Sequence, residues 1–282
     1  MDVTVMAVTD ARYLDRSRWD DVNTAELRAW TTRSREREAG ASSSRVEVAA
    51  GQSFAPAVPE RYWHQTCYMF PPQPCPPNNM DVFGGRRLRG SAYGRGLLDV
   101  RRDLRAGGFD LRFRVIAAGT LGGTRVPLQR RIFLGGADPY ATFANPFLRS
   151  RGALFARDAV HYQAPGGVGL RGYAAAASAT WVVALNAEAG LRLLERPRRR
   201  LFSAITLAAF ADVALLDRAA LGGAGAADAG LGIRAAHRIG PTRFVTRVDL
   251  PVLVSRPAAV VAGAAGDGAF KFRWVWSLEE AF

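Results

Sequence analysis

Apolar and polar residues alternate along most of this chain, most clearly in its last segment. From Phe270 to Phe282 the even positions are apolar except for Glu280, and the odd positions include Arg273 and Glu279. Successive side chains of a β-strand point to opposite faces, so a period of two predicts a strand with one apolar and one polar face.

The same alternation recurs upstream and predicts more strands. In the segment 181–193 the odd positions are apolar, while Asn186, Glu188 and Arg192 share the other face, and the segment 109–117 repeats this pattern. The total is on the order of ten to twelve strands, many of them long enough for the roughly 9 to 11 residues with which a tilted strand crosses a bilayer. The remaining candidate strands are Val3–Thr9, Val22–Thr32, Arg45–Phe54, Ala92–Leu104, Leu201–Val213, Gly230–Arg238 and Arg243–Val254.

Periodicity by itself fits a soluble β-sandwich or a lipocalin-like barrel as well as a membrane barrel. Three features favour the membrane: aromatic residues near strand ends, charged residues in mid-strand on the polar face, and an aromatic residue at the end of the chain. No apolar stretch reaches the roughly 18 to 20 residues of a membrane helix. We therefore expect an all-β protein, an antiparallel transmembrane β-barrel that forms one domain over residues 1–282.

Composition and charge narrow the function classes. The chain has 282 residues, 49% of them hydrophobic, and a formal net charge of +13 to which Lys271 contributes the only lysine. The arginines are scattered singly and are not gathered in a basic patch with interleaved aromatics, so we do not expect nucleic acid as a partner. Arginine that faces a water-filled lumen, or lipid phosphates at the membrane surface, explains the same charge.

Two cysteines, Cys67 and Cys75, lie in a Pro-rich segment that we interpret as a long loop over residues 55–85. Proline at this density cannot pair in a sheet. Two cysteines in one exposed loop suit a disulfide in an oxidising compartment, and two unrelated loop thiols fit the sequence equally well.

Motifs for catalysis or cofactor binding are weak. Two segments match glycine fingerprints of dinucleotide sites, 167–172 and 230–235, but neither sits between a buried strand and a helix. There is no nucleophile elbow. No histidine has a second ligand at metal-binding spacing, and the carboxylates are expected to pair with arginine. We expect no catalytic residues, no metal and no cofactor; the three histidines are His64, His161 and His237.

The tetrapeptide Leu170-Arg171-Gly172-Tyr173 resembles the V/I/L-R-G-Y/F motif of the BamA/TamA-like outer-membrane assembly and two-partner-secretion superfamily, the bacterial surface antigen family. Upstream, Pro127–Gly136 is similar to the family's strand that ends in Gly-Gly. Downstream, Asn186-Ala187-Glu188 and Phe210-Ala211-Asp212 resemble its N-x-E and F-x-D, although Ala214 stands where the family usually has glycine. The resemblance covers about residues 105–282, and Gly230–Arg234, Gly240-Pro241 and the terminal strand continue its order.

The resemblance implies a fold and a site. The family's barrel has sixteen strands preceded by periplasmic POTRA modules, so this chain would be a truncated barrel. A long loop, here residues 135–173, would fold back into the lumen. It would place Arg171 against Asp212, with Glu188 as a further candidate partner. The terminal strand resembles the insertion signal of such barrels, carried here by Phe272, Trp274, Trp276 and Phe282.

The resemblance also implies a location and a role. We expect a protein of the bacterial outer membrane that contacts the lipid bilayer and lipopolysaccharide, and that inserts or translocates unfolded or secreted polypeptides. One alternative is a membrane anchor or pore for an N-terminal hydrolase domain, and a less favoured one is a soluble ligand-binding β-barrel. Residues 1–4 show no basic region followed by an apolar core, so the sequence as given has no signal peptide, and we expect a fragment or a misplaced start.

Overall fold

The structure is a computed structural model, and most of the chain can be described from it. The described residues are 2–6, 20, 22–54, 90–122, 126–135, 162–163, 167–173, 178–195, 202–217, 225–239, 242–255, 270 and 275–280. They form an all-β protein, as the alternation predicts. Among them no helix has the length and apolar character needed to cross a membrane.

Eight long strands dominate the structure, and each has 13 or 15 residues. They are β2 (Asn23–Arg37), β3 (Gly40–Phe54), β4 (Ala92–Ala106), β5 (Phe109–Leu121), β9 (Trp181–Glu195), β10 (Ala204–Leu216), β11 (Gly225–Ile239) and β12 (Thr242–Val254). The shorter elements are β1 (Asp2–Met6), η3 (Leu128–Arg130), β6 (Ile132–Phe133), β7 (Tyr162–Gln163), β8 (Ser178–Ala179) and β13 (Val275–Glu280).

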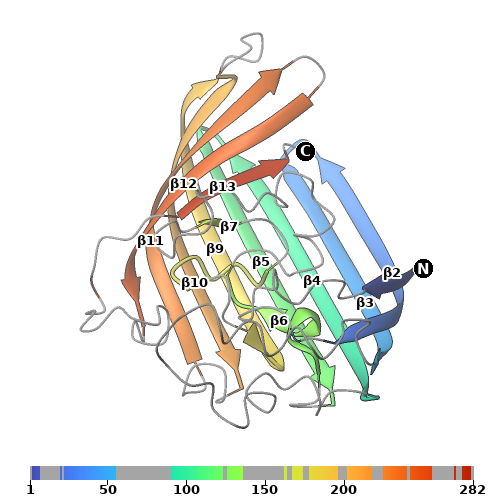
Figure 1. Cartoon of the computed structure of the whole chain (residues 1–282). Coiled ribbons are helices and arrows are strands. Elements are labelled where there is room, and N and C mark those ends of the chain that lie inside the picture. Colours follow the sequence, from blue (N-terminus) through green and yellow to red (C-terminus); the bar gives the residue numbers. More distant parts are fainter. Residues whose placement is uncertain are drawn as a thin grey trace.

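The long strands pair antiparallel with their neighbours in one curved sheet (Figure 1). The sheet order is β1-β2-β3-β4-β5-β9-β10-β11-β12-β13-β7, and only the β13–β7 pair is parallel. β5 pairs with β9 although residues 122–180 separate them in sequence, and β7, from within that segment, pairs with β13 near the other end of the same sheet. Within the described residues no pairing joins β1 to the opposite end of this order.

The two faces of the sheet have opposite character. Over residues 181–190 of β9 the odd residues are apolar and mostly exposed, and the even residues are buried; Leu185 is 42% exposed, whereas Asn186 and Glu188 are 8% and 7% exposed. The same arrangement places Asp212 on the buried face of β10 between exposed leucines and valines. The protein is therefore apolar on its exposed face and charged on its buried face, the reverse of a water-soluble sheet.

A small apolar core fills part of the buried face. Leu134, Val168 and Leu170 come from the segment between β5 and β9, and they pack with Ile116 and Val182 of those two strands. The described parts of this segment, 126–135 and 167–173, thus lie on the concave side of the sheet, where η3 and β6 lie in front of the long strands in Figure 1.

One expected element is wrong. The segment Pro127–Gly136 resembles a barrel strand in sequence, but its described residues 127–135 contain the η3 turn and the two-residue strand β6, which within the described part of the chain pairs with β8 in a separate sheet. Its polar residues explain the difference, because Gln129 and Arg130 are buried by contacts with another part of the chain and not by a neighbouring strand.

Other expectations need smaller adjustments. β2 and β3 extend beyond the predicted strands to Arg37 and from Gly40, because their polar ends pair across a tight hairpin where no apolar alternation is required. The predicted loop 55–85 lies outside the described residues, and the predicted loop 135–173 is described only at residue 135, 162–163 and 167–173.

Candidate functional site

The tetrapeptide 170–173 lies on the buried face of β9 to β12. Its approach is held by main-chain hydrogen bonds: the N–H of Val168 donates to the carbonyl of Phe133 at 2.9 Å, and the N–H of Leu170 donates to that of Leu134 at 3.0 Å. Leu170 is fully buried in the apolar core. These contacts fix where the next residue, Arg171, enters the sheet's polar face.

Arg171 contacts both carboxylates named for it from the sequence. Its Nη1 donates to Glu188 Oε2 at 3.0 Å, and its Nε lies 3.1 Å from Asp212 Oδ2. The guanidinium also lies 3.9 Å from the ring centroid of Phe210, so it stacks on an aromatic face. Arginine suits this position because its planar, multiply donating group can serve two carboxylates and a ring at once.

Strand register brings the acidic partners together. β9 and β10 pair so that Phe210 is opposite Glu188 and Asp212 is opposite Asn186. The Asn186 amide donates to Asp212 Oδ1 at 3.1 Å and to the carbonyl of Gly169 at 3.2 Å. The N-x-E and F-x-D segments, which lie more than twenty residues apart in sequence, therefore form one surface under the tetrapeptide.

Glu188 is the centre of this charged site. Three arginines from different segments, Arg171, Arg234 of β11 and Arg247 of β12, donate to its Oε2, at 3.0, 2.5 and 3.0 Å. All four groups are buried. Burying a carboxylate costs several kcal/mol unless it is paired, so this convergence of cations is what permits Glu188 at a buried position.

Gly172 is required by close approach. A Cβ at this position would lie 2.6 Å from Val254 Cγ2 and 2.9 Å from Asp228 Cβ, inside van der Waals contact. Asp228 is the direct partner of Asp212 across β10 and β11. Glycine thus lets the tetrapeptide backbone reach the floor of the site, where two acidic residues face it.

Tyr173, the last residue of the tetrapeptide, contacts β11 and the residue that follows β12. Its hydroxyl lies 2.9 Å from the carbonyl of Ser255 and 3.0 Å from the Ser255 hydroxyl, and it accepts from the N–H of Ala227 at 3.2 Å. The segment is therefore tied to β9 through β12 by four successive residues. Such an arrangement is a docked loop with buried ion pairs.

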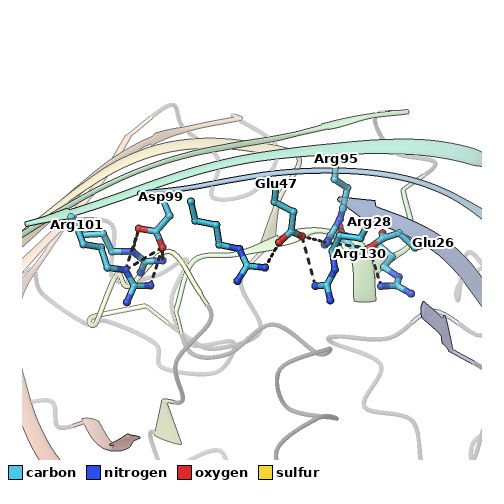
Figure 2. A network of polar contacts seen from close by, with 9 residues as sticks. Glu26, Arg28, Glu47, Arg95, Asp99, Arg101 and Arg130 are labelled. Carbon is cyan, nitrogen blue, oxygen red and sulfur yellow. Dashed lines mark hydrogen bonds and ion pairs between the residues drawn. The ribbon is translucent and has the colours of Figure 1, made fainter. Parts of the chain in front are cut away.

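A second charged cluster, which the sequence did not reveal, lies under β2 to β4. Figure 2 shows Glu26, Glu47, Asp99 and surrounding arginines on the underside of the arched sheet. Arg95 lies 3.3 Å from Glu26 and 3.5 Å from Glu47, so it bridges two strands. Asp99 is held by Arg101 and by Arg114, each at 2.9 Å.

The η3 segment docks onto this second cluster. Arg130 is almost fully buried and donates to Glu26 Oε1 at 3.3 Å and to the Thr24 hydroxyl at 3.1 Å. Gln129 accepts from the N–H of Asp20 at 3.0 Å. The only sequence signal was the polar group Gln129-Arg130-Arg131 inside an otherwise apolar segment, and it gave no indication of its partners.

Several predicted residues cannot be placed in the site. Cys67, Cys75, Phe272, Trp274 and Phe282 lie outside the described residues, as do His64 and His161. Trp276 lies on β13 opposite Val248. The ring of His237 contacts the rings of Phe202 and Phe244, with centroid distances of 5.2 and 4.8 Å.

Of the two glycine motifs, residues 230–235 lie within the strand β11, and among the described residues no helix that could bind a dinucleotide phosphate follows β11. In the part of the chain that is described, no group of three or more potential ligands could hold a metal. Comparison with family models, with curated proteins and with solved structures found no match to this chain.

Proposed function

We propose that this chain is the barrel portion of an outer-membrane protein that inserts or translocates polypeptides. The observation that carries the membrane part is the reversed polarity of the sheet. Large apolar side chains such as Val183, Leu215 and Leu231 are 46%, 61% and 54% exposed, while charged residues occupy the buried face. A hydrocarbon environment outside and a polar lumen inside account for both faces.

Exposed apolar residues form an outward-facing band across the long strands and support the same proposal. The band includes Leu27 on β2, Val46 and Val48 on β3, Leu98 on β4, Val115 on β5 and Leu185 on β9. Such a band on the outer face is expected when strands face the hydrocarbon of a bilayer.

Closure is a requirement of this proposal. An unpaired strand edge inside a bilayer leaves backbone N–H and C=O groups without partners, at a cost of several kcal/mol each. The two ends of the sheet order must therefore meet each other, or meet strands outside the described residues or outside this chain, when the protein is in the membrane.

The docked tetrapeptide supports the polypeptide-handling part. Leu170 to Tyr173 resemble the lumenal loop motif of the bacterial surface antigen family, and Arg171 lies against the two segments that resemble the family's N-x-E and F-x-D. Three separate sequence resemblances thus meet at one place. From that likeness we infer a location in the bacterial outer membrane. Lipid and lipopolysaccharide would surround the barrel, and an unfolded polypeptide would be the substrate.

The membrane part is tested by refolding the full chain with and without detergent. We expect a β-rich far-UV circular dichroism spectrum only with detergent, and a band on gels that changes mobility only after boiling. A water-soluble monomer that unfolds cooperatively without detergent would overturn the proposal and favour a soluble β-fold.

The polypeptide part needs a separate experiment. Vesicles containing the folded full chain are mixed with an unfolded client barrel, and protease-protected client is measured over time against empty vesicles. Arg171→Ala should reduce the rate, and the exposed control Arg105→Ala should leave it unchanged. If the chain conducts ions but does not speed client insertion, the role of membrane anchor or pore for an attached hydrolase domain is favoured instead.

A further inference from the structure

The outward face of β2 to β4 changes character toward its short-turn end. On β2 the odd residues face outward, since Leu27 is exposed while Glu26 is buried, and this row continues without a register shift through Arg33, Arg35 and Arg37. On β4 the even residues face outward, and the row passes from Leu98 and Val100 to Arg102. Beyond the apolar band, the same face therefore carries arginines.

Strand register gathers these arginines into one patch. Arg35 is the partner of Ser42 on β3, and Ser42 is the partner of Arg102 on β4, so the three residues form a straight row across three strands. Arg33 is paired with Ser44 in the adjacent row. Strands lie about 4.8 Å apart, which puts the backbones of Arg35 and Arg102 about 10 Å from each other. We call Arg33, Arg35, Arg37, Arg102, Ser42 and Ser44 the arginine–serine patch.

The patch has positive charge without internal compensation. Alternation sends the strand carboxylates Glu36 and Asp103 to the opposite face, and Glu38 lies in the two-residue turn next to Arg37. Within the described residues none of the four arginines has an ion pair, in contrast to the arginines of the buried face. All four are exposed. Four guanidinium groups and two hydroxyls on one face can all donate hydrogen bonds to an anion.

We propose that the arginine–serine patch binds the headgroups of anionic phospholipids. This inference rests on the proposed membrane location and names a partner of that barrel. The patch lies directly beyond the exposed apolar band, at the depth where lipid phosphates lie. Guanidinium groups and hydroxyls bind phosphate oxygens with charge-assisted hydrogen bonds.

Connection lengths identify the leaflet. At the patch end the strands are joined through residues 38–39, 107–108, 196–203 and 240–241, whereas at the other end the longer segments 7–22, 55–91 and 122–180 and the segment 217–224 connect them. Outer-membrane barrels have short turns on the periplasmic side and longer loops outside. The patch therefore faces the phospholipid leaflet, and the ligand is an anionic phospholipid and not lipopolysaccharide.

The test uses the full chain folded in nonionic detergent, titrated with short-chain phosphatidylglycerol or phosphatidylcholine, with bound lipid counted by native mass spectrometry. Wild type should prefer phosphatidylglycerol. An arginine near a membrane surface contributes about a fivefold gain in affinity, so the double variant Arg35→Ser/Arg102→Ser should bind phosphatidylglycerol roughly 25-fold more weakly. Added salt should reduce the wild-type preference.

The matched control is Arg105→Ser/Arg238→Ser. It removes the same charge at the same end of the sheet from exposed residues whose alternation places them on the inner face. This variant should keep the wild-type preference. Equal loss in both variants would mean that net charge alone attracts the lipid, and unchanged binding in the patch variant would mean that the headgroup lies elsewhere; either result overturns the inference.

The same samples separate this inference from the membrane proposal. Each is run unboiled and boiled on a gel, so a folded, heat-modifiable chain without lipid preference counts against the patch alone. A chain that folds without detergent counts against the membrane location, and the patch inference fails with it.

Discussion

The guanidinium of Arg171 stacks 3.9 Å from the ring centroid of Phe210 while its Nη1 donates to Glu188 Oε2 at 3.0 Å. Phe210 and Glu188 are direct partners across β10 and β9. One arginine from a loop segment thus contacts both members of a cross-strand pair, a ring on one strand and a carboxylate on the other, in addition to its ion pair with Asp212. This pair explains why docking depends on side-chain chemistry and not only on apolar contact.

Removing the arginine should destabilise the fold. Arg171→Ala leaves Asp212 and Glu188 buried with fewer cations, and breaking a buried ion pair on one side costs about 3–5 kcal/mol. Arg171→Lys should fall between this variant and wild type, since an ammonium cannot span two carboxylates and a ring. The temperature at which heat-modifiable migration is lost measures the effect. The exposed Arg105→Ala serves as control, and wild-type behaviour of Arg171→Ala would show that the pairing is dispensable.

Adding one methyl group at Gly172 should disturb the same docking. The new Cβ of Gly172→Ala would meet Val254 Cγ2 at 2.6 Å, and such overpacking costs about 1–3 kcal/mol. Val254→Ala in the same chain should restore part of the loss, because it removes the colliding methyl. Gly96→Ala is the control, since nothing lies within 4 Å of its added Cβ. Denaturant unfolding of wild type, Gly172→Ala, Val254→Ala and the double variant gives the coupling. Equal effects of Gly172→Ala and Gly96→Ala would contradict the close approach.

A charged residue introduced on the outward face distinguishes a membrane-embedded sheet from a water-soluble one. Leu185 lies in the middle of β9 on the exposed apolar face. Leu185→Arg should cost about 2–4 kcal/mol in a bilayer, whereas Thr31→Arg, on the polar part of β2, should cost about 0–1 kcal/mol. Unfolding in lipid vesicles measures both. For a water-soluble sheet both substitutions are surface changes, so two small and similar effects would reject the membrane-facing assignment.

The terminal aromatic residue is expected to act in targeting. Deleting Phe282, in a chain carrying a cleavable secretion leader, should lower the amount recovered in the outer-membrane fraction, because the segment resembles an insertion signal. Phe282→Tyr keeps a terminal aromatic ring and should behave like wild type. Unchanged recovery of the deletion would argue that insertion does not depend on this residue.

Much of the sheet could be read from periodicity, but mainly where one face is apolar. β9 and β5 contain long uninterrupted rows, and both were predicted as strands. The polar halves of β2 and β3 carry no such row, so the strands predicted on either side of the hairpin at Glu38 and Ala39 are too short. Hairpin pairing supplies the missing hydrogen bonds there irrespective of side-chain polarity.

The residues around Arg171 could be predicted from the sequence only through the motifs that they resemble. The second charged cluster could not be predicted from the sequence at all. Glu26, Glu47 and Arg95 are ordinary charged residues within predicted strands, and Arg130 lies in a segment that looked like a strand. Their association depends on which strands are neighbours and on a segment far away in sequence. Nothing in local spacing carries that information.

The sequence by itself determined the alternation that makes this protein all-β, and in strands such as β9 and β10 it placed apolar and charged residues on opposite faces, because side-chain direction in a strand is a local property of the backbone. It did not determine which face is buried, since both faces obey the same period. The tertiary structure decided that the charged face is inside. Sheet curvature and the segment between β5 and β9 together enclose carboxylates such as Glu188 and Asp212, and only long-range packing brings arginines to neutralise them there.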